Sequence, residues 1–281
     1  MNARRAGFTL VELLVVMAIA GIVLAAVYQT LITQERSVRQ SYALINVQNT
    51  TRTALEVLTS ELREISATDS DLVRADSISI RFRGMRKAGV VCASDPSFNW
   101  VDVAEVGSAF ADGDSVLLFS DGANPSSGID DSWIVRQVNT VNASANCAGN
   151  PISPNVRRLN LTSPATNVIP GALARSFVHL GYRLVNAGGE GHLYMMEAGD
   201  SVPLVEDLAT IANQGIRFRY WDSTGVAIPV ANLTNAATRN TVARIQLKVR
   251  GNAVGGESGD RRMLSDSLVS TVYLRGNRKL R

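Results

Sequence analysis

Glu12 is the residue whose surroundings call for chemistry, because it is the only charged residue in a largely apolar run from Phe8 to Val27. A carboxylate at the centre of a membrane helix costs about 2.5–3.5 kcal/mol, and less near the interface, so a partner is expected for it. Arg4 and Arg5 precede the run. If they stay attached, Glu12 can simply reach the lipid headgroups. If the chain is cut just before Phe8, a free amine arises close to the carboxylate and a charge pair becomes available.

The apolar run has the length of a membrane helix. About 20 helical residues at 1.5 Å each span about 30 Å, the hydrocarbon thickness of a bilayer. A secretory signal peptide would instead have an apolar stretch of roughly 7–15 residues followed by a small-residue cleavage site. The basic start of the chain orients the N-terminus toward the cytoplasm. We therefore expect a helix in the bacterial inner membrane, with the remaining chain in the periplasm.

The segment around Glu12 matches a processing motif. Its residues, Gly7-Phe8-Thr9-Leu10-Val11-Glu12, resemble the prepilin peptidase motif of type IV pilins and type II secretion pseudopilins. The resemblance implies that prepilin peptidase removes residues 1–7 as a leader by cutting after Gly7, and that the new N-terminal Phe8 is methylated. It also implies that Glu12 pairs with the amino group of a neighbouring subunit's Phe8. An unpaired buried charge is strongly penalised, so this pair would fix the axial register between subunits.

Three C-terminal segments extend the resemblance. They are similar to the closing strands of PilW-like minor pilins and J-type pseudopilins: Ile211–Gly225, Val242–Gly251 and Leu268–Arg275. The resemblance implies a minor pilin, a low-copy subunit that helps to initiate or cap assembly of a type IV pilus. The alternative is a J-type pseudopilin of the type II secretion system. A chain of 281 residues is larger than expected of a repeating major subunit, which favours a low-copy position near the filament tip.

The implied partners are prepilin peptidase, the inner membrane, the major pilin, and other minor pilins or pseudopilins in a hetero-oligomeric filament. A membrane-anchored periplasmic binding module, in which the helix is a plain anchor, is a further alternative. Such a module would keep Arg4 and Arg5 on the mature protein, whereas a pilin would begin at methylated Phe8.

Residues 8–66 are predicted to form one helix, since neither Pro nor Gly interrupts positions 22–66. Residues 8–28 would lie in the membrane or the filament core, and residues 29–66 would continue as an amphipathic helix packed on the globular domain. The expected buried face recurs at three- and four-residue spacing: Val38, Tyr42, Ile45, Arg52, Leu55, Leu58, Leu62 and Ile65. A coiled coil is the competing account of so long a helix. The polar Asn49 and Thr59 interrupt the heptad, which favours packing against a sheet.

Residues 67–281 are predicted to form a periplasmic, antiparallel β-rich domain. Apolar and polar residues alternate in Ile78–Phe82, Ile216–Tyr220 and Ile245–Val249, as in strands with one buried face. Further strands are predicted at Ser115–Phe119, Trp133–Val141, Val156–Leu161, Phe177–Val185, Leu193–Glu197 and Leu268–Leu274, with a Gly-rich turn from Gly251 to Asp260. Strands without crossover helices form antiparallel sheets. The predicted fold class is α+β, a long N-terminal helix packed on one or two antiparallel sheets, as in pilins.

Cys92 and Cys147 both lie in polar, loop-like sequence. In an exported chain an even number of cysteines permits a disulfide, which we expect between these two; two free buried thiols are the alternative. No metal-ligand spacing links them to His179 or His192. His179 is predicted on the exposed face of a strand and His192 in a Gly-rich turn.

Acidic pairs occur at Asp112/Asp114 and Asp130/Asp131. Loops of this kind can supply oxygen ligands to calcium, but turn chemistry accounts for an Asp-Gly-Asp segment equally well. No metal ion or cofactor is therefore predicted. The sequence also offers no constellation of nucleophile, base and orienting group, so we expect a structural protein and not an enzyme.

The charge balance gives little reason to expect a nucleic acid partner. Without Arg4 and Arg5 the 28 basic residues become 26, against 25 acidic ones. Outside the basic run Arg275–Arg281, which we interpret as a solvated tail, the sequence shows no stripe of clustered Lys and Arg. The sequence therefore predicts no nucleic acid partner.

Replacement of Glu12 by Val should leave cleavage after Gly7 intact but weaken incorporation into filaments, because the neighbour's amino group loses its partner. The ratio of variant to wild-type subunit in filaments purified from cells that express both measures this effect. Equal amounts of the two subunits would contradict the predicted role of Glu12.

Overall fold

The computed structural model describes residues 9–95, 97, 99–124, 130–143, 147, 155–255 and 262–275. Within these residues one long helix precedes a series of strands, and all pairings between the named strands are antiparallel. In chain order the elements are α1 (Leu10–Glu64), β1 (Leu72–Ala75), β2 (Ser79–Ser94), β3 (Trp100–Val106), β4 (Ser115–Ser120), β5 (Ser132–Ala143), β6 (Val156–Leu161), β7 (Leu173–Ala187), β8 (Glu190–Glu197), β9 (Asp200–Leu208), β10 (Ile216–Asp222), β11 (Ala227–Ile228), η1 (Val230–Thr234), α2 (Ala236–Asn240), β12 (Val242–Gly255) and β13 (Arg262–Tyr273).

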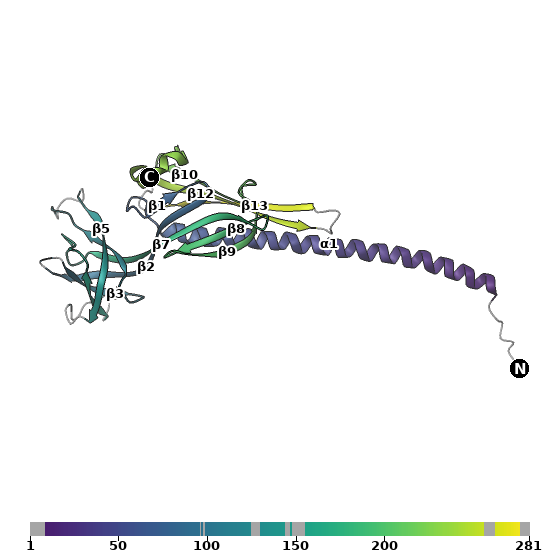
Figure 1. The fold of residues 1–281 in the computed structure, drawn as a ribbon, viewed down its shortest axis with the longest axis horizontal. Helices are drawn as coiled ribbons and strands as arrows, with labels where there is room; N and C mark the ends of the chain where they lie inside the picture. Colours follow the sequence, from purple (N-terminus) through teal and green to yellow (C-terminus); the bar gives the residue numbers. More distant parts are fainter. Residues whose placement is uncertain are drawn as a thin grey trace.

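The molecule is elongated along α1 (Figure 1). The N-terminal part of α1 projects alone toward one end, strands gather along its C-terminal part, and a second group of strands lies beyond the end of the helix. A long helix packed on antiparallel β-structure is the α+β, pilin-like architecture expected from the sequence, which is thus confirmed.

Local sequence sets both ends of α1. Thr9 is the N-cap, and its Oγ1 accepts a hydrogen bond from the backbone N–H of Glu12 at 3.3 Å. This bond satisfies one of the donors that the first turn leaves unpaired. At the other end Ile65 is extended, and the backbone N–H of Ser66 donates to Asp71 Oδ2 at 2.9 Å. The 55 residues between the two ends form an uninterrupted helix about 80 Å long.

The buried stripe of α1 begins further along the helix than the periodicity predicted. Its buried residues are Val47, Thr51, Ala54, Leu58, Thr59 and Leu62. Four residues expected on the same face are instead exposed: Val38, Tyr42, Ile45 and Arg52. The prediction for these four is wrong. For Val38, Tyr42 and Ile45 the reason is that periodicity identifies a face of a helix but not how far along that face the sheet extends. Arg52 lies between the buried Thr51 and Ala54 in sequence but is exposed, so it lies off the buried face.

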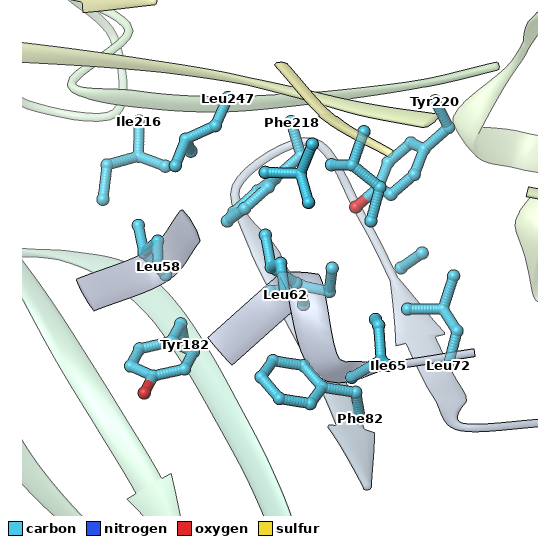
Figure 2. Packing of buried hydrophobic residues seen from close by; sticks show 14 of the residues in the cluster. Leu58, Leu62, Ile65, Leu72, Phe82, Tyr182, Ile216, Phe218, Tyr220 and Leu247 are labelled. Atoms are coloured by element: carbon cyan, nitrogen blue, oxygen red, sulfur yellow. The ribbon is translucent and has the colours of Figure 1, made fainter. Parts of the chain in front are cut away.

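The C-terminal part of α1 lies between two groups of strands. Figure 2 shows Leu58, Leu62 and Ile65 of α1 and its end among side chains from both groups: Ile216, Phe218, Tyr220 and Leu247 on one side, and Phe82 and Tyr182 on the other. The buried hydroxyl of Tyr220 donates to the carbonyl of Asp76 at 2.8 Å, so its polar atom is satisfied within the core. The helix is therefore the centre of this core.

Gly251 marks the close approach of β12 to the helix. A Cβ at this position would lie 2.7 Å from Thr51 Cγ2 and 2.8 Å from Val47 Cγ1, so only glycine fits without a shift. The single pairing of Gly251 with Leu208 also joins β12 to β9. The turn predicted to begin at Gly251 starts later, since β12 continues to Gly255; residues 256–261 lie outside the described residues.

The strands β2, β3, β6, β5, β4 and β7 form a closed barrel, which lies between β1 and β8 in the order of the sheet. The long strands β2 and β7 pair with each other and continue beyond the end of α1 (Figure 1). In this distal part β2 pairs with β3 and β7 with β4, and the order β3–β6–β5–β4 closes the ring. The barrel has a core of its own, which includes Val91, Val101, Val103, Phe110, Val116, Leu118, Val138 and Leu159.

Apolar periodicity predicted the positions of most strands but not those of β1, β3, β9 and β11. In β3 the acidic residues Asp102 and Glu105 are buried among apolar neighbours, so the expected alternation is absent. In β9 most side chains are exposed and Pro203 interrupts the pattern. Closure of the barrel could not be predicted either, because alternation identifies a strand's faces and not its neighbours.

Arg175 of β7 joins the barrel to the loop that follows α1. Its guanidinium lies 3.4 Å from carboxylate oxygens of both Asp69 and Asp71, and 4.2 Å from the centre of the Trp133 ring on β5. Burial raises the pKa of the Asp71 carboxyl, and the nearby Arg175 and the Ser66 N–H oppose that rise. The barrel and the part of the molecule around α1 are therefore joined by this charge cluster as well as by the continuous strands β2 and β7.

Leu62→Ala should lower the free energy of unfolding by about 2–5 kcal/mol, because it leaves a cavity between the two groups of strands. Leu44→Ala is the matched control: Leu44 lies on the same helix but is exposed, and a change within about 0.5 kcal/mol is expected. Denaturant unfolding of the purified chain in detergent measures both variants. Equal destabilisation would contradict the placement of the core.

Candidate functional site

The N-terminal part of α1 is an apolar surface that the rest of the described chain leaves uncovered. Its large apolar side chains from Leu10 to Ile45 are exposed, apart from Ile32, which is half-buried. By length and composition this part of the helix can cross a membrane, and none of its most apolar stretch is buried within the molecule. A continuous apolar surface of this kind marks a membrane or protein interaction site. We take it as the candidate site and call it the assembly helix, residues 10–45.

Glu12 lies exposed in the first turn of the assembly helix. A negative charge is favourable there, because the first turn presents unpaired N–H groups and the positive end of the helix dipole. Thr9 and Glu12 also occupy the N-cap and N3 positions of a Thr-x-x-Glu capping pattern. Thr9 and Glu12 thus help to start the helix, in addition to any role of Glu12 in assembly.

The remaining N-terminal residues singled out by the sequence lie outside the described residues: Arg4, Arg5, Gly7 and Phe8. Cleavage after Gly7, methylation of Phe8 and the charge pair with Glu12 therefore stay predictions.

Polar side chains on the assembly helix find partners within the helix. The hydroxyls of Thr30, Thr33 and Ser41 each donate to the carbonyl four residues earlier, at 2.8–2.9 Å. Glu35 and Arg39 form an ion pair at 3.4 Å. Hydroxyls bonded in this way bring no unpaired donor into apolar surroundings, so the helix is suited to lipid or to packing against other helices.

Cys92 and Cys147 form a disulfide in the inserted barrel, and neither is a free thiol. Cys92 lies on β2, whereas Cys147 lies in the connection between β5 and β6, 55 residues away. The disulfide expected from the export signal is thus present. It ties the connection between two barrel strands to the long strand that leaves the barrel.

An ion pair between a buried carboxylate and a half-buried arginine lies on neighbouring strands of the barrel. Asp102 of β3 is inaccessible to solvent and accepts two hydrogen bonds from Arg158 of β6, from Nε at 2.9 Å and from Nη2 at 3.0 Å. The same guanidinium lies 3.5 Å from the centre of the Trp100 ring. The hydrogen bonds to Asp102 raise the pKa of Arg158. Two-point contact of this kind fixes the register of β3 against β6, which is a structural role.

The two histidines lie apart from each other. His179 is exposed on β7, as predicted, with its ring 5.5 Å from that of Phe177. His192 was predicted in a turn, and this is wrong: β8 begins at Glu190, and the Nδ1 atom of His192 lies 3.8 Å from Glu206. The glycines before it, at positions 188 and 189, form the turn and leave His192 in the strand.

Asp112, Asp114 and Asp130 accept hydrogen bonds from protein donors in this structure. Asp112 accepts a hydrogen bond from the Val141 N–H at 2.7 Å, and Asp114 accepts one from Lys87 Nζ at 2.7 Å. Asp130 accepts from the backbone N–H groups at positions 123 and 124. Across the part of the chain that the structure describes, no group of three His, Cys, Asp or Glu side chains converges to hold a metal ion.

Comparison with known proteins identifies the N-terminal segment. Residues 2–28 match the family described as the prokaryotic N-terminal methylation motif. No curated protein and no solved structure matches the chain. The matched residues include the predicted leader and the first part of the assembly helix. Motif and exposed apolar helix together support a type IV pilin-like family, processed by prepilin peptidase and assembled into filaments. A specific similarity to PilW-like or J-type proteins is not part of this match.

One group of charged residues escaped sequence analysis. Five basic residues share the outward face of β10 and β12: Arg217, Arg219, Arg244, Lys248 and Arg250. Alternation in the sequence placed each of them on the polar face of a strand. Their clustering depends on which strands pair and in what register, and that information is not local to either strand.

Replacement of both cysteines by Ser should lower the free energy of unfolding by about 2–4 kcal/mol, because the disulfide closes a long loop in the unfolded chain. Denaturant unfolding of the wild-type chain and the double variant, each with and without reductant, measures this. Reductant should destabilise the wild-type chain and leave the double variant unchanged. A wild-type chain whose stability ignores the reductant would contradict the structural role of the bond.

Proposed function

We propose that this chain is a minor pilin of a type IV pilus, a low-copy subunit that helps to initiate or cap pilus assembly through its N-terminal helix. In this proposal prepilin peptidase cuts after Gly7 and Phe8 is then methylated. The observation that carries the proposal is the N-terminal methylation motif at residues 2–28 joined to a helix whose first part is uncovered and whose last part is enclosed by a folded domain.

The assembly helix would serve in two surroundings. In the bilayer its apolar side chains would face lipid, and in the filament they would face the same helix of neighbouring subunits. Transfer between the two changes little in apolar burial, because lipid tails are as apolar as the packed side chains. Glu12 differs, since a carboxylate needs a partner in either setting. Pairing with the amino group of a neighbour's Phe8 would supply that partner and set the register.

The inserted barrel favours a low-copy position near the tip. It lies beyond the C-terminal end of α1, at the opposite end of the molecule from the N-terminus (Figure 1). In a filament whose helices run along the axis, a lobe that extends past the helix end occupies space that the next subunit's domain would need. A subunit at or near the tip avoids this conflict. The same geometry suits a pseudopilin at the tip of a type II secretion filament, so the experiment must separate the two.

Deletion of the gene should remove most surface pili, and the intact gene should restore them, because a subunit that starts assembly limits the number of filaments. The measurement is a count of pili per cell by electron microscopy. A gene encoding Glu12→Val should restore fewer pili than the intact gene. The matched control is Glu56→Val, which removes an exposed carboxylate from the same helix outside the assembly helix and should restore pili fully.

Unchanged pilus numbers in the deletion strain would contradict the minor pilin role. The pseudopilin would then be the better account, and the amounts of secreted proteins in the culture medium would be the next quantity to compare.

A further inference from the structure

The face of β10 and β12 that points away from α1 carries a stripe of positive charge, which we call the basic face. It is defined by Arg217 and Arg219 on β10 and by Arg244, Lys248 and Arg250 on β12. The strand register sets Arg217 beside Lys248, and the next row sets Arg219 beside Gln246. Side chains two residues apart on a strand are about 6.6–6.8 Å apart, and neighbouring strands are about 4.8 Å apart. The five cations therefore form one continuous patch.

The basic face is accessible to solvent, with Arg219 exposed and the other four cations half-buried, whereas the opposite face of the two strands is packed. The residues between the cations are buried against α1 and its surroundings, including Ile216, Phe218, Ile245, Leu247 and Val249. On the open side a shallow hollow of about 290 Å³ is lined by Gln214, Arg217, Arg219, Gln246, Lys248 and Ser267, among others. The basic face thus forms a hollow and is not packed against another part of the described chain.

Carboxylates do not neutralise the basic face. Among the described residues of β10, β12 and β13 there are two, Asp222 and Asp266. Asp222 accepts hydrogen bonds from Thr224 and Val226 within its own turn. Asp266 alternates with the exposed Ser267 and so belongs to the opposite face. Within the described chain none of the five cations forms an ion pair with a carboxylate.

Aromatic side chains flank one end of the basic face. The register places Arg244 between Trp221 of β10 and Tyr273 of β13. The Arg244 guanidinium lies 4.4 Å from the centre of the Trp221 ring, and Tyr273 is 59% exposed. A cationic surface bordered by an exposed aromatic ring such as Tyr273 is the arrangement that proteins use for single-stranded nucleic acids, whose bases stack on aromatic rings while the backbone follows the charges.

We infer that the basic face binds a single strand of nucleic acid. Nucleic acid interfaces are much more positive than protein interfaces, and this face carries five cations. The sequence alone predicted no nucleic acid partner, because the cations are dispersed along the chain and only the register brings them together. In the proposed filament the face would point away from the helix bundle; that location rests on the proposed function, but the binding does not.

The test measures binding of a fluorescent 30-nucleotide oligothymidine to the full-length chain in non-ionic detergent, by anisotropy over a range of salt concentrations. Wild-type affinity should fall linearly with salt on logarithmic axes. Arg217→Ala combined with Lys248→Ala should reduce that slope by about 1.4, since each phosphate contact on a single strand contributes about 0.7. The matched control, Arg52→Ala combined with Arg63→Ala, removes two exposed cations from α1 and should leave affinity and slope unchanged.

A second variant separates stacking from charge. Tyr273→Ala should weaken oligothymidine binding by about fivefold or more, because one base loses its stacking partner, while binding of inorganic polyphosphate stays unchanged. Tyr273 is exposed, and an unaltered unfolding temperature identifies the effect as local.

Three outcomes would overturn the inference: no binding of oligothymidine by the wild-type chain, equal losses in the basic-face and α1 variants, or a 30-base-pair duplex that binds more tightly than the single strand. None of these outcomes bears on pilus numbers, so the inference and the proposed function fail independently.

Discussion

Burial of apolar surface along one helix is the constraint from which the rest of the molecule follows. The C-terminal part of α1 is enclosed by strands on both sides, with Leu58 and Leu62 at the centre of the larger core. The N-terminal part has an equally apolar surface and no cover from the described chain. Exposing the apolar side chains along half of this helix to water would cost free energy. The subunit is therefore incomplete by itself, and its first half must lie in lipid or among other helices.

The β-structure is arranged so that this helix can be held firmly while one end stays uncovered. Gly251 lets β12 come close to α1 beside Val47, near the point where the buried stripe begins. Beyond the other end of the helix, β2 and β7 extend into a separate barrel with its own core and its own disulfide. Arg175, held between carboxylates and Trp133, connects that barrel to the loop after the helix. Packed and charged contacts thus connect the helix to the surrounding strands and to the barrel.

The features that sequence analysis predicted well are those encoded locally. The Gly7-Phe8…Glu12 segment, the long helix and most strands depend on residue type and period, and the match of residues 2–28 to the methylation motif agrees with the first of these. The features that were missed depend on which distant segments meet. The closed barrel and the basic face around Arg217 and Lys248 follow from strand order and register, and the exposure of Tyr42 follows from where the strands end along α1. Alternation supplied the correct face of the strand for Arg217 and Lys248 but could not identify the neighbouring strand.

The central claim is that α1 is an assembly helix released by processing, and not a permanent anchor. Mass spectrometry of the chain purified from cell membranes and from sheared filaments tests it most directly, because the two accounts differ at the N-terminus. The claim predicts a mature chain that begins at N-methylated Phe8, without Arg4 and Arg5. A chain that begins at Met1 in both fractions would contradict it and would make the helix a plain membrane anchor.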